Sequence, residues 1–270
     1  METKKFSTQI FEPMTTIDEV SRYSDELLKT ASIPDYPSAL NGLQFECRAP
    51  LRGIAAAVDF STRAIEGVKA VSANLLIVHH GMFWGGLAPL TGAVHRRVRL
   101  LFDNDIAVYS SHIPLDCHPT LGNNVLLARE LQLTPSKEFA WYQGIFIGVA
   151  GECDVATQAL VERASSFARQ YGHIVRTTPI KEGRRTKRWG MCSGAGAAAD
   201  TLKEAIDAGI DTLIVGEGPH WTAITAEEND LVVIYAGHYA TETLGVCALA
   251  RHLSDKYKVP WQFVSAPTGL

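Results

Sequence analysis

Short apolar runs alternate with helical segments along most of this chain, and this alternation restricts the fold more than any other feature. Three such runs lie in the first half, at residues 53–59, 74–80 and 106–112. Apolar runs of this length are typical of strands buried on both faces, and strands that alternate with helices usually form parallel sheets. We therefore predict an α/β fold with mostly parallel or mixed sheets.

The second half of the chain continues in the same style after a boundary at Pro135 and the polar residues 136–138. Further strands are expected at 142–149, 173–178, 188–193, 212–215, 231–236 and 261–264, and helices at 155–171, 200–208 and 241–257. We predict two interlinked α/β lobes, because the closing elements can return to the first one. The first lobe would hold residues 1–135 and 236–270, and the second would hold 136–235.

Composition limits the classes of function. The chain of 270 residues is 46% apolar and carries 25 basic against 29 acidic residues. This mildly acidic balance disfavours nucleic acid or an anionic membrane as a partner. The five cysteines are scattered, without a CxxC pair, which favours a reducing compartment. No signal peptide is visible in residues 1–13 and no apolar stretch is long enough to span a membrane, so we expect a cytoplasmic protein.

Histidines and carboxylates follow the predicted strands, at the edge where ligands bind in parallel α/β sheets. His79 and His80 end one strand and precede Gly81. Neighbouring side chains on a regular strand point to opposite faces, but at a strand end before glycine the pair can diverge towards two ions. Taken alone, one core histidine and one surface histidine would be the commoner explanation.

A second cluster follows the next predicted strand. Pro114 argues against an ordinary helix here, so we expect a shaped loop. Asp116 is a candidate anionic ligand, and His112 or His118 could orient it or carry a proton. The alternative is a turn in which Asp116 caps the helix expected near Leu121.

The third cluster pairs His238 with Glu242 across a strand-to-helix turn. A glutamate in the first turn of a helix also suits the helix dipole, yet its two oxygens can bridge two cations. Glu217, after another strand, is a further candidate base. Imidazole and carboxylate ligands together suit zinc, iron, manganese or nickel, and five of them suit two ions with open positions. The candidate ligands are His79, His80, Asp116, His238 and Glu242.

Two other segments, a glycine-rich turn and a basic run, are alternative candidates for ligand binding. Residues 194–199 match GxGxxG/A, and Glu217 follows Gly196 by 21 positions, a spacing that imitates a dinucleotide-binding fingerprint. We favour a tight strand-to-helix turn whose amides face the cleft. The basic segment 181–188 could contact phosphates, although a solvated hairpin tip is the preferred interpretation.

The order of these motifs resembles one family. Segments 78–81, 112–116 with 121–124, 216–217 and 237–242 follow one another as in the dinuclear metal-centre hexameric proteins, also called NGG-one-interacting-factor-three-like. Members are often labelled type 2 GTP cyclohydrolase I. The resemblance implies two interlinked lobes, a toroidal homohexamer built as a trimer of dimers, and two divalent metal ions per chain. Carried onto this sequence, the ligands are the same five residues, with Glu242 as the bridge. Many members have His-Thr-Asn-Leu-Asp where this chain has residues 112–116, which changes possible substrate contacts.

Three functions remain open. The first is a metal-dependent hydrolase, GTP cyclohydrolase-like, that acts on a nucleotide or related heterocycle through activated water. Glu242 would hold both ions, His112 or His118 would shuttle a proton, and Glu217 could act as a base. The second is a non-catalytic metal carrier or ring-shaped regulatory scaffold. The third, binding of nucleic acid through the ring, is disfavoured by the acidic charge.

Overall fold

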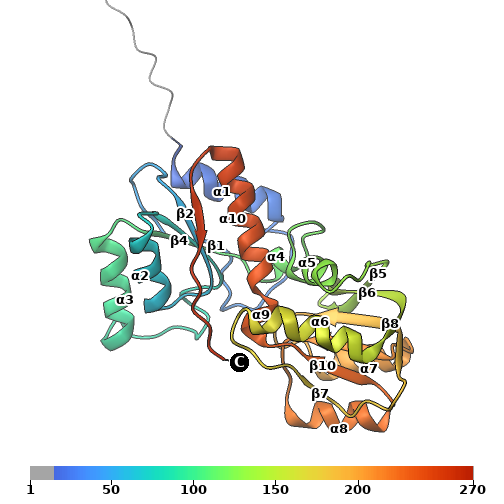
Figure 1. The fold of residues 1–270 in the computed structure, drawn as a ribbon. Helices are drawn as coiled ribbons and strands as arrows, with labels where there is room; N and C mark the ends of the chain where they lie inside the picture. The colour runs from blue at the N-terminus through green and yellow to red at the C-terminus, as the bar shows by residue number, and fades with distance from the viewer. Residues whose placement is uncertain (1–14, 270) are drawn as a thin grey trace, which may run out of the picture.

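Two mixed sheets, each covered by helices, form the architecture of residues 15–269, which the computed structural model describes (Figure 1). The first sheet has the order β1-β4-β3-β2-β11, and all of its neighbours are parallel except β1 and β4. Its strands are β1 (Gly42–Phe45), β2 (Ile54–Asp59), β3 (Leu75–His80), β4 (Ala107–Ser110) and β11 (Trp261–Phe263). The predicted mixed α/β class is confirmed.

Side-chain alternation along β2 and β3 explains why helices cover both faces of this sheet. Ile54 and Ile77 point into a core shared with α1 (Ile17–Leu28) and α10 (Thr243–Tyr257). Leu76 and Val78 point the other way, into a core closed by α2 (Thr62–Ala70) and α3 (Gly92–Asp103). Because both faces are covered, β3 is buried along its whole length, including its final histidines.

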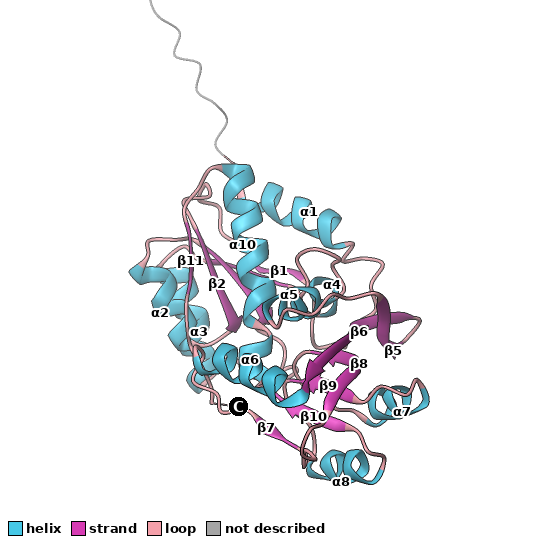
Figure 2. Ribbon diagram, turned by 45° about the vertical axis from the view of Figure 1, so that its right-hand side comes forward, coloured by secondary structure: helices cyan, strands magenta, loops and turns pink. Residues whose placement is uncertain are grey.

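The second sheet has the order β5-β6-β8-β9-β10-β7 (Figure 2). Strands β8, β9 and β10 are parallel, whereas β5, β6 and β7 pair antiparallel with their neighbours. The strands are β5 (Lys137–Tyr142), β6 (Ile145–Ala156), β7 (Arg176–Thr177), β8 (Arg185–Cys192), β9 (Thr212–Val215) and β10 (Val232–Tyr235). Helices α5 (Asn123–Glu130) and α6 (Thr157–Arg169) cover one face, and α7 (Ala199–Asp207) and α8 (His220–Glu228) cover the other.

Several elements differ from the expectations. Residues 137 and 138, expected in a boundary, begin β5, because the β5–β6 hairpin pairs them with Val149 and Ala150. The helix α8 was not expected. Pro114 does not prevent a helix: it lies in the first turn of α4 (Ile113–Asp116), where a backbone N–H has no helical partner to lose. A short helix that was not expected, α9 (His238–Thr241), precedes α10, which matches the helix expected at 241–257.

The basic segment is divided between two structures. Residues 182 and 183 form a turn, and β8 begins at Arg185. Lys181 and Arg184 both pair with Asp230, so part of the positive charge is neutralised within the chain. The segment is a surface connection rather than the expected hairpin tip, because β7 pairs with β10 whereas β8 pairs with β6 and β9.

Among residues 15–269, no helix is both long and apolar enough to cross a membrane. The expectation about a signal peptide falls on residues 1–13, which lie outside the described residues. The boundaries of the two lobes and the cytoplasmic location stay predictions.

Candidate metal centre

The structure brings the five predicted ligand residues together between the two sheets. His79 and His80 end β3, with exposed fractions of 0% and 6%. Asp116 ends α4, His238 begins α9, and Glu242 lies between α9 and α10 with 3% exposure. The carboxyl end of β3 in one sheet thus faces the turn that follows β10 in the other, as expected for a ligand site in α/β proteins.

Glu242 is the centre of this group, since each of its carboxylate oxygens faces different histidines. Its Oε1 lies 3.6 Å from Nε2 of His79, which lies 3.5 Å from Oδ2 of Asp116. Its Oε2 lies 3.5 Å from Nε2 of His80 and 3.1 Å from Nε2 of His238. Two sets of three ligand atoms therefore share one carboxylate.

Each of the three histidine ligands has an oxygen atom within hydrogen-bond distance of its Nδ1. The partner of His79 is the Ser111 carbonyl at 2.9 Å, and that of His80 is Oδ1 of Asp59 at 2.8 Å. The partner of His238 is Oε1 of Glu217 at 2.8 Å. A neutral imidazole that donates from Nδ1 keeps a lone pair on Nε2, which is the arrangement of metal-ligating histidines.

The burial of the remaining polar atoms supports a fit to metal ions. Nε2 of His79, Nε2 of His80 and Oε2 of Glu242 are all buried, and none has a hydrogen-bond partner among residues 15–269. Ligand atoms that surround one ion at 2.0–2.2 Å in tetrahedral geometry are about 3.4 Å apart, close to the separations found here. Buried polar atoms without partners are costly, and an ion would satisfy all three.

His112 extends the cluster on the other side of His79. The ligand atoms of His79, His80 and His112 lie within 4.8 Å of one another, as do those of His80, His238 and Glu242. His112 Nδ1 contacts Oδ1 of Asp35 at 2.8 Å. His112 is therefore placed to serve as a further ligand or as the proton carrier predicted from the sequence.

The buried charges of the cluster stabilise one another. Burial alone would lower the pKa of His79, but the carboxylates of Asp116 and Glu242 raise it well above its ordinary value. Burial alone would raise the pKa of Glu242, yet the nearby His80 and His79 hold it well below its ordinary value. Burial likewise opposes the effect of Glu242 and Glu217 on His238, whose pKa is raised to about 9. Without a metal, the raised pKa values favour protons on His79 and His238. A metal ion would compete with these protons for the same nitrogen atoms.

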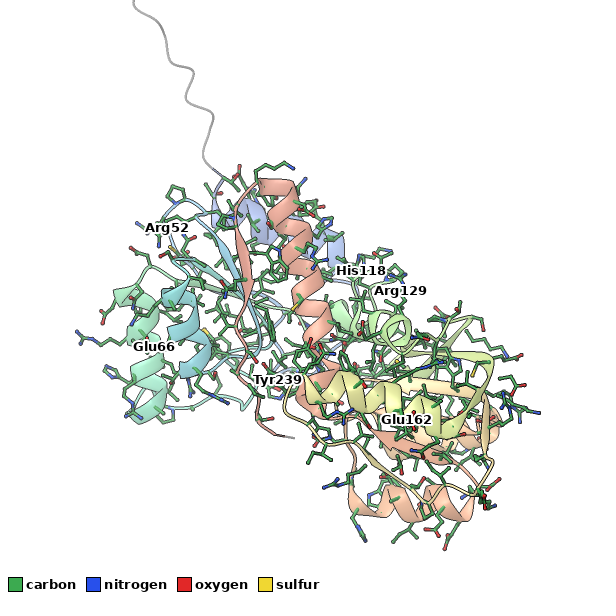
Figure 3. The ribbon with its side chains drawn as sticks, viewed as in Figure 1. Arg52, Glu66, His118, Arg129, Glu162 and Tyr239 are labelled. Carbon is green, nitrogen blue, oxygen red and sulfur yellow. The ribbon has the colours of Figure 1, made fainter. Side chains whose placement is uncertain are left out.

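The other two predicted proton-transfer residues have different positions. Glu217 is half-exposed and orients His238 from the side opposite Glu242. His118 is not brought to the cluster: its Nδ1 accepts the backbone N–H of Leu121, in the loop before α5. Figure 3 shows His118 beside α10, apart from Tyr239, which lies where the two sheets meet. Asp116 accepts a hydrogen bond from the Asn123 side chain rather than capping a helix end.

The glycine-rich turn at 194–199 has a steric role next to Glu242. Gly194 has φ +59°, and a Cβ there would lie 2.1 Å from Oε1 of Glu242. A Cβ at Gly216 would lie 2.5 Å from the Gly194 carbonyl, and one at Gly196 would lie 2.1 Å from that of Cys192. This packing explains the glycines without a dinucleotide.

Aromatic rings form a wall beside the cluster. The ring of Trp84 is centred 4.7 Å from that of His80 and 4.5 Å from that of His112. Tyr36 contacts Trp84 on one side and Tyr142 on the other. A pocket of about 190 Å³ opens here, lined by Asp59, His80, Trp84, Glu217, His238, Tyr239 and Thr268. A planar ring could stack in such a place.

Sequence reasoning missed three residues that matter to this geometry. Asp59 was noted only as a strand end, whereas it orients His80. Asp35 and Tyr36 lie in the loop after α1 and reach His112 across the chain. No periodicity or motif marks such a loop, so only the tertiary structure reveals it.

Comparisons with known proteins agree with this fold. The family described as Duf34/NIF3 (NGG1p interacting factor 3) matches residues 15–268. A protein of Deinococcus radiodurans named GTP cyclohydrolase 1 type 2 homolog is 41% identical, and a Pyrococcus abyssi protein of the same name is 39% identical. The alignments cover 94% of this chain in both cases, and 94% and 99% of those proteins.

Solved structures are also similar. A protein titled ybgI, of unknown function, superimposes with a TM-score of 0.85 at 30% identity, over 95% of this chain and all of that one. The protein TTHA1606 from Thermus thermophilus gives a TM-score of 0.78 at 33% identity, over 95% of this chain and all of that one. The similarity thus extends through both sheets.

Proposed function

This chain belongs to the Duf34/NIF3 family, and from that premise we propose that it is a hydrolase with two metal ions that acts on a nucleotide or a related heterocycle. The cleaved bond would be a C–N bond, in keeping with the name GTP cyclohydrolase 1 type 2 homolog that its relatives carry. The observation that carries this proposal is Glu242, which is buried beside Nε2 of His79 and Nε2 of His80. Among residues 15–269, these two nitrogens and Oε2 of Glu242 have no hydrogen-bond partner.

The first set consists of His79, Asp116 and Oε1 of Glu242, and the second consists of His80, His238 and Oε2 of Glu242. Divalent ions at such sites activate water and stabilise developing negative charge. Three protein ligands per ion would leave positions open for water and substrate.

The chain's own residues would supply orientation and proton transfer. Asp35 fixes the ring of His112 through Nδ1, which leaves Nε2 free to accept a proton from water and return it to the leaving nitrogen. Glu217 holds His238 in position. Trp84 and Tyr36 offer faces on which a heterocycle can stack, which favours a planar substrate.

The proposal is tested by metal content and turnover on the same sample. We expect about two transition-metal ions per chain by elemental analysis, as a two-ion site requires. With GTP first and other nucleotides next, we expect loss of the intact heterocycle, measured by chromatography, to stop on chelation and return on metal addition. Two ions without turnover of any heterocycle would instead support the metal carrier or scaffold.

Asp59 tests the orientation of one ligand without removing it. We expect Asp59→Asn to weaken metal binding by about 10–100-fold, the usual effect of losing a carboxylate behind a ligating histidine. The amide can still contact His80, but it no longer adds negative charge to Nδ1. Titration with a competing chelator measures this affinity. Asp103→Asn, on the exposed end of α3, is the matched control, and equal affinities in the two variants would contradict the prediction.

We also propose that the chain assembles as a homohexamer, a trimer of dimers. Large apolar side chains are exposed at Leu87, Leu90 and Phe102, with exposed fractions of 97%, 64% and 68%. Exposed apolar side chains such as these can be covered by another copy of the chain in an assembly. Light scattering on the sample used for metal analysis gives the mass of the assembly.

A further inference from the structure

A second pocket adjoins the metal centre, on the far side of Glu217. Its volume is about 280 Å³, and its polar lining includes His173, Arg176, Glu217 and His220. Glu217 also lines the pocket over the metal cluster, so it forms a wall common to both. The second pocket lies beyond the carboxyl ends of β9 and β10, where α/β proteins place their ligands.

The basic side chains around this pocket have no partner within the described part of the chain. Arg176, on the edge strand β7, is exposed and makes neither an ion pair nor a side-chain hydrogen bond among residues 15–269. Both ring nitrogens of His173 are buried, and neither has a hydrogen-bond partner in the described part of the chain. The ring of His173 is fixed against Gly237, where a Cβ would lie 2.5 Å from it. Unsatisfied buried nitrogens at a pocket wall indicate a missing polar ligand.

The start of α8 adds further hydrogen-bond donors to the same pocket. This helix of nine residues begins at His220, and its N-cap Pro219 provides no side-chain cap. No acidic residue lies in its first turn. Backbone N–H groups at the start of a helix can bind anions. Here the start of α8 lines the same pocket as the side chains of Arg176 and His220.

The single acidic side chain of the lining, Glu217, is engaged by a partner outside this pocket. Its Oε1 accepts a hydrogen bond from Nδ1 of His238 at 2.8 Å. The remaining lining is backbone and neutral side chains, including Tyr235, whose hydroxyl contacts Thr222. An anion therefore meets one guanidinium, two imidazoles and the helix start.

We propose that this pocket is the subsite for a phosphoryl group of the substrate. The inference rests on the proposed function, because it assumes that the same molecule reaches the metal ions past Glu217. The planar fork of a guanidinium suits two phosphoryl oxygens, and the volume is ample for a phosphate group. The substrate would thus be a phosphorylated small molecule, with its ring towards Trp84 and its phosphate towards Arg176.

Binding of inorganic phosphate to the full-length protein tests the subsite directly, by ligand-observed phosphorus NMR. We expect saturable binding that Arg176→Gln weakens by about tenfold or more, since it removes a charge-assisted hydrogen bond. The metal content of Arg176→Gln should equal that of the unchanged protein. Arg99→Gln, an exposed substitution on α3 of the other lobe, should bind phosphate like the unchanged protein.

A third variant separates this inference from the proposed function. Glu242→Gln removes the carboxylate shared by the metal ligands, and it should still bind phosphate. Loss of phosphate binding in Glu242→Gln, with no effect of Arg176→Gln, would mean that phosphate binds the metal ions and would overturn the subsite. Absence of saturable binding in the metal-loaded protein would overturn it too, while leaving the hydrolase proposal in place. Conversely, phosphate binding by the unchanged protein, if that protein takes up no metal even when metal is added, would support the subsite and contradict the hydrolase.

Discussion

Replacing Glu242 by glutamine is expected to abolish the metal centre, with a fall from about two ions per chain to less than one. Of the five ligand residues, Glu242 alone contacts His79, His80 and His238. The amide removes a negative charge and turns one of the two facing oxygens into an N–H₂ group, which cannot ligate a cation. Elemental analysis of the purified variant gives the result, and turnover should disappear with the metal.

The matched control is Glu228→Gln, at the exposed end of α8, which makes the same chemical change away from the cluster. It should retain full metal content. If Glu242→Gln also retained two ions with unchanged affinity, the carboxylate would not be a bridge. The division of the ligands into two sets would then be wrong.

Most ligand residues of this site can be predicted from the sequence, because they lie at or just after the ends of strands. A buried parallel strand must finish at one edge of its sheet, so His79, His80 and His238 were expected at the edge that binds ligands. Glu242 follows His238 by four residues, and that spacing placed it in the same turn region. In the structure, Nε2 of each of these three histidines lies within 3.6 Å of a carboxylate oxygen of Glu242.

The residues that orient the cluster could not be predicted in the same way. Asp35 lies in a loop and reaches His112 from 77 residues away, and no periodic pattern governs such a contact. The helix α8 was not predicted because its large apolar residues do not mark a side that faces the core: Trp221 and Ile224 are both exposed. Because α8 lines the proposed phosphate pocket, that pocket could not be predicted from the sequence either. Local patterns therefore indicated the ligands, whereas tertiary contacts determine their orientation.

The glycine-rich turn shows how a pattern can be recognised and its cause missed. Residues 194–199 imitate a nucleotide fingerprint, yet the backbone of Gly194 is held for another reason. Its N–H donates to Thr241 at 3.0 Å, and its carbonyl accepts the N–H of Glu217 at 2.8 Å. The turn thus joins β8 to the segments that carry Glu217 and Glu242.

Replacing Gly194 by alanine is therefore expected to damage both the metal centre and the stability of the fold. The hydrogen bonds on both sides prevent the backbone from moving away, so the new Cβ must displace Oε1 of Glu242, 2.1 Å distant. A positive φ costs alanine about 1–2 kcal/mol, and the overlap adds about 1–3 kcal/mol. We expect the free energy of unfolding to fall by about 2–5 kcal/mol in metal-free urea titrations, and metal affinity to fall by more than tenfold.

Gly183→Ala separates the two causes. Gly183 has a similar φ of +72°, but a Cβ placed there would have no atom within 4 Å, so only the backbone cost of about 1–2 kcal/mol applies. Its metal affinity should equal that of the unchanged protein. Equal losses of stability in the two variants, with metal affinity retained in Gly194→Ala, would show that Glu242 can move without cost. If the Gly194 turn holds Glu242 in one place, Gly194→Ala should lose more stability than Gly183→Ala and should also bind metal more weakly. The glycine would then determine the position of a pre-organised bridging carboxylate.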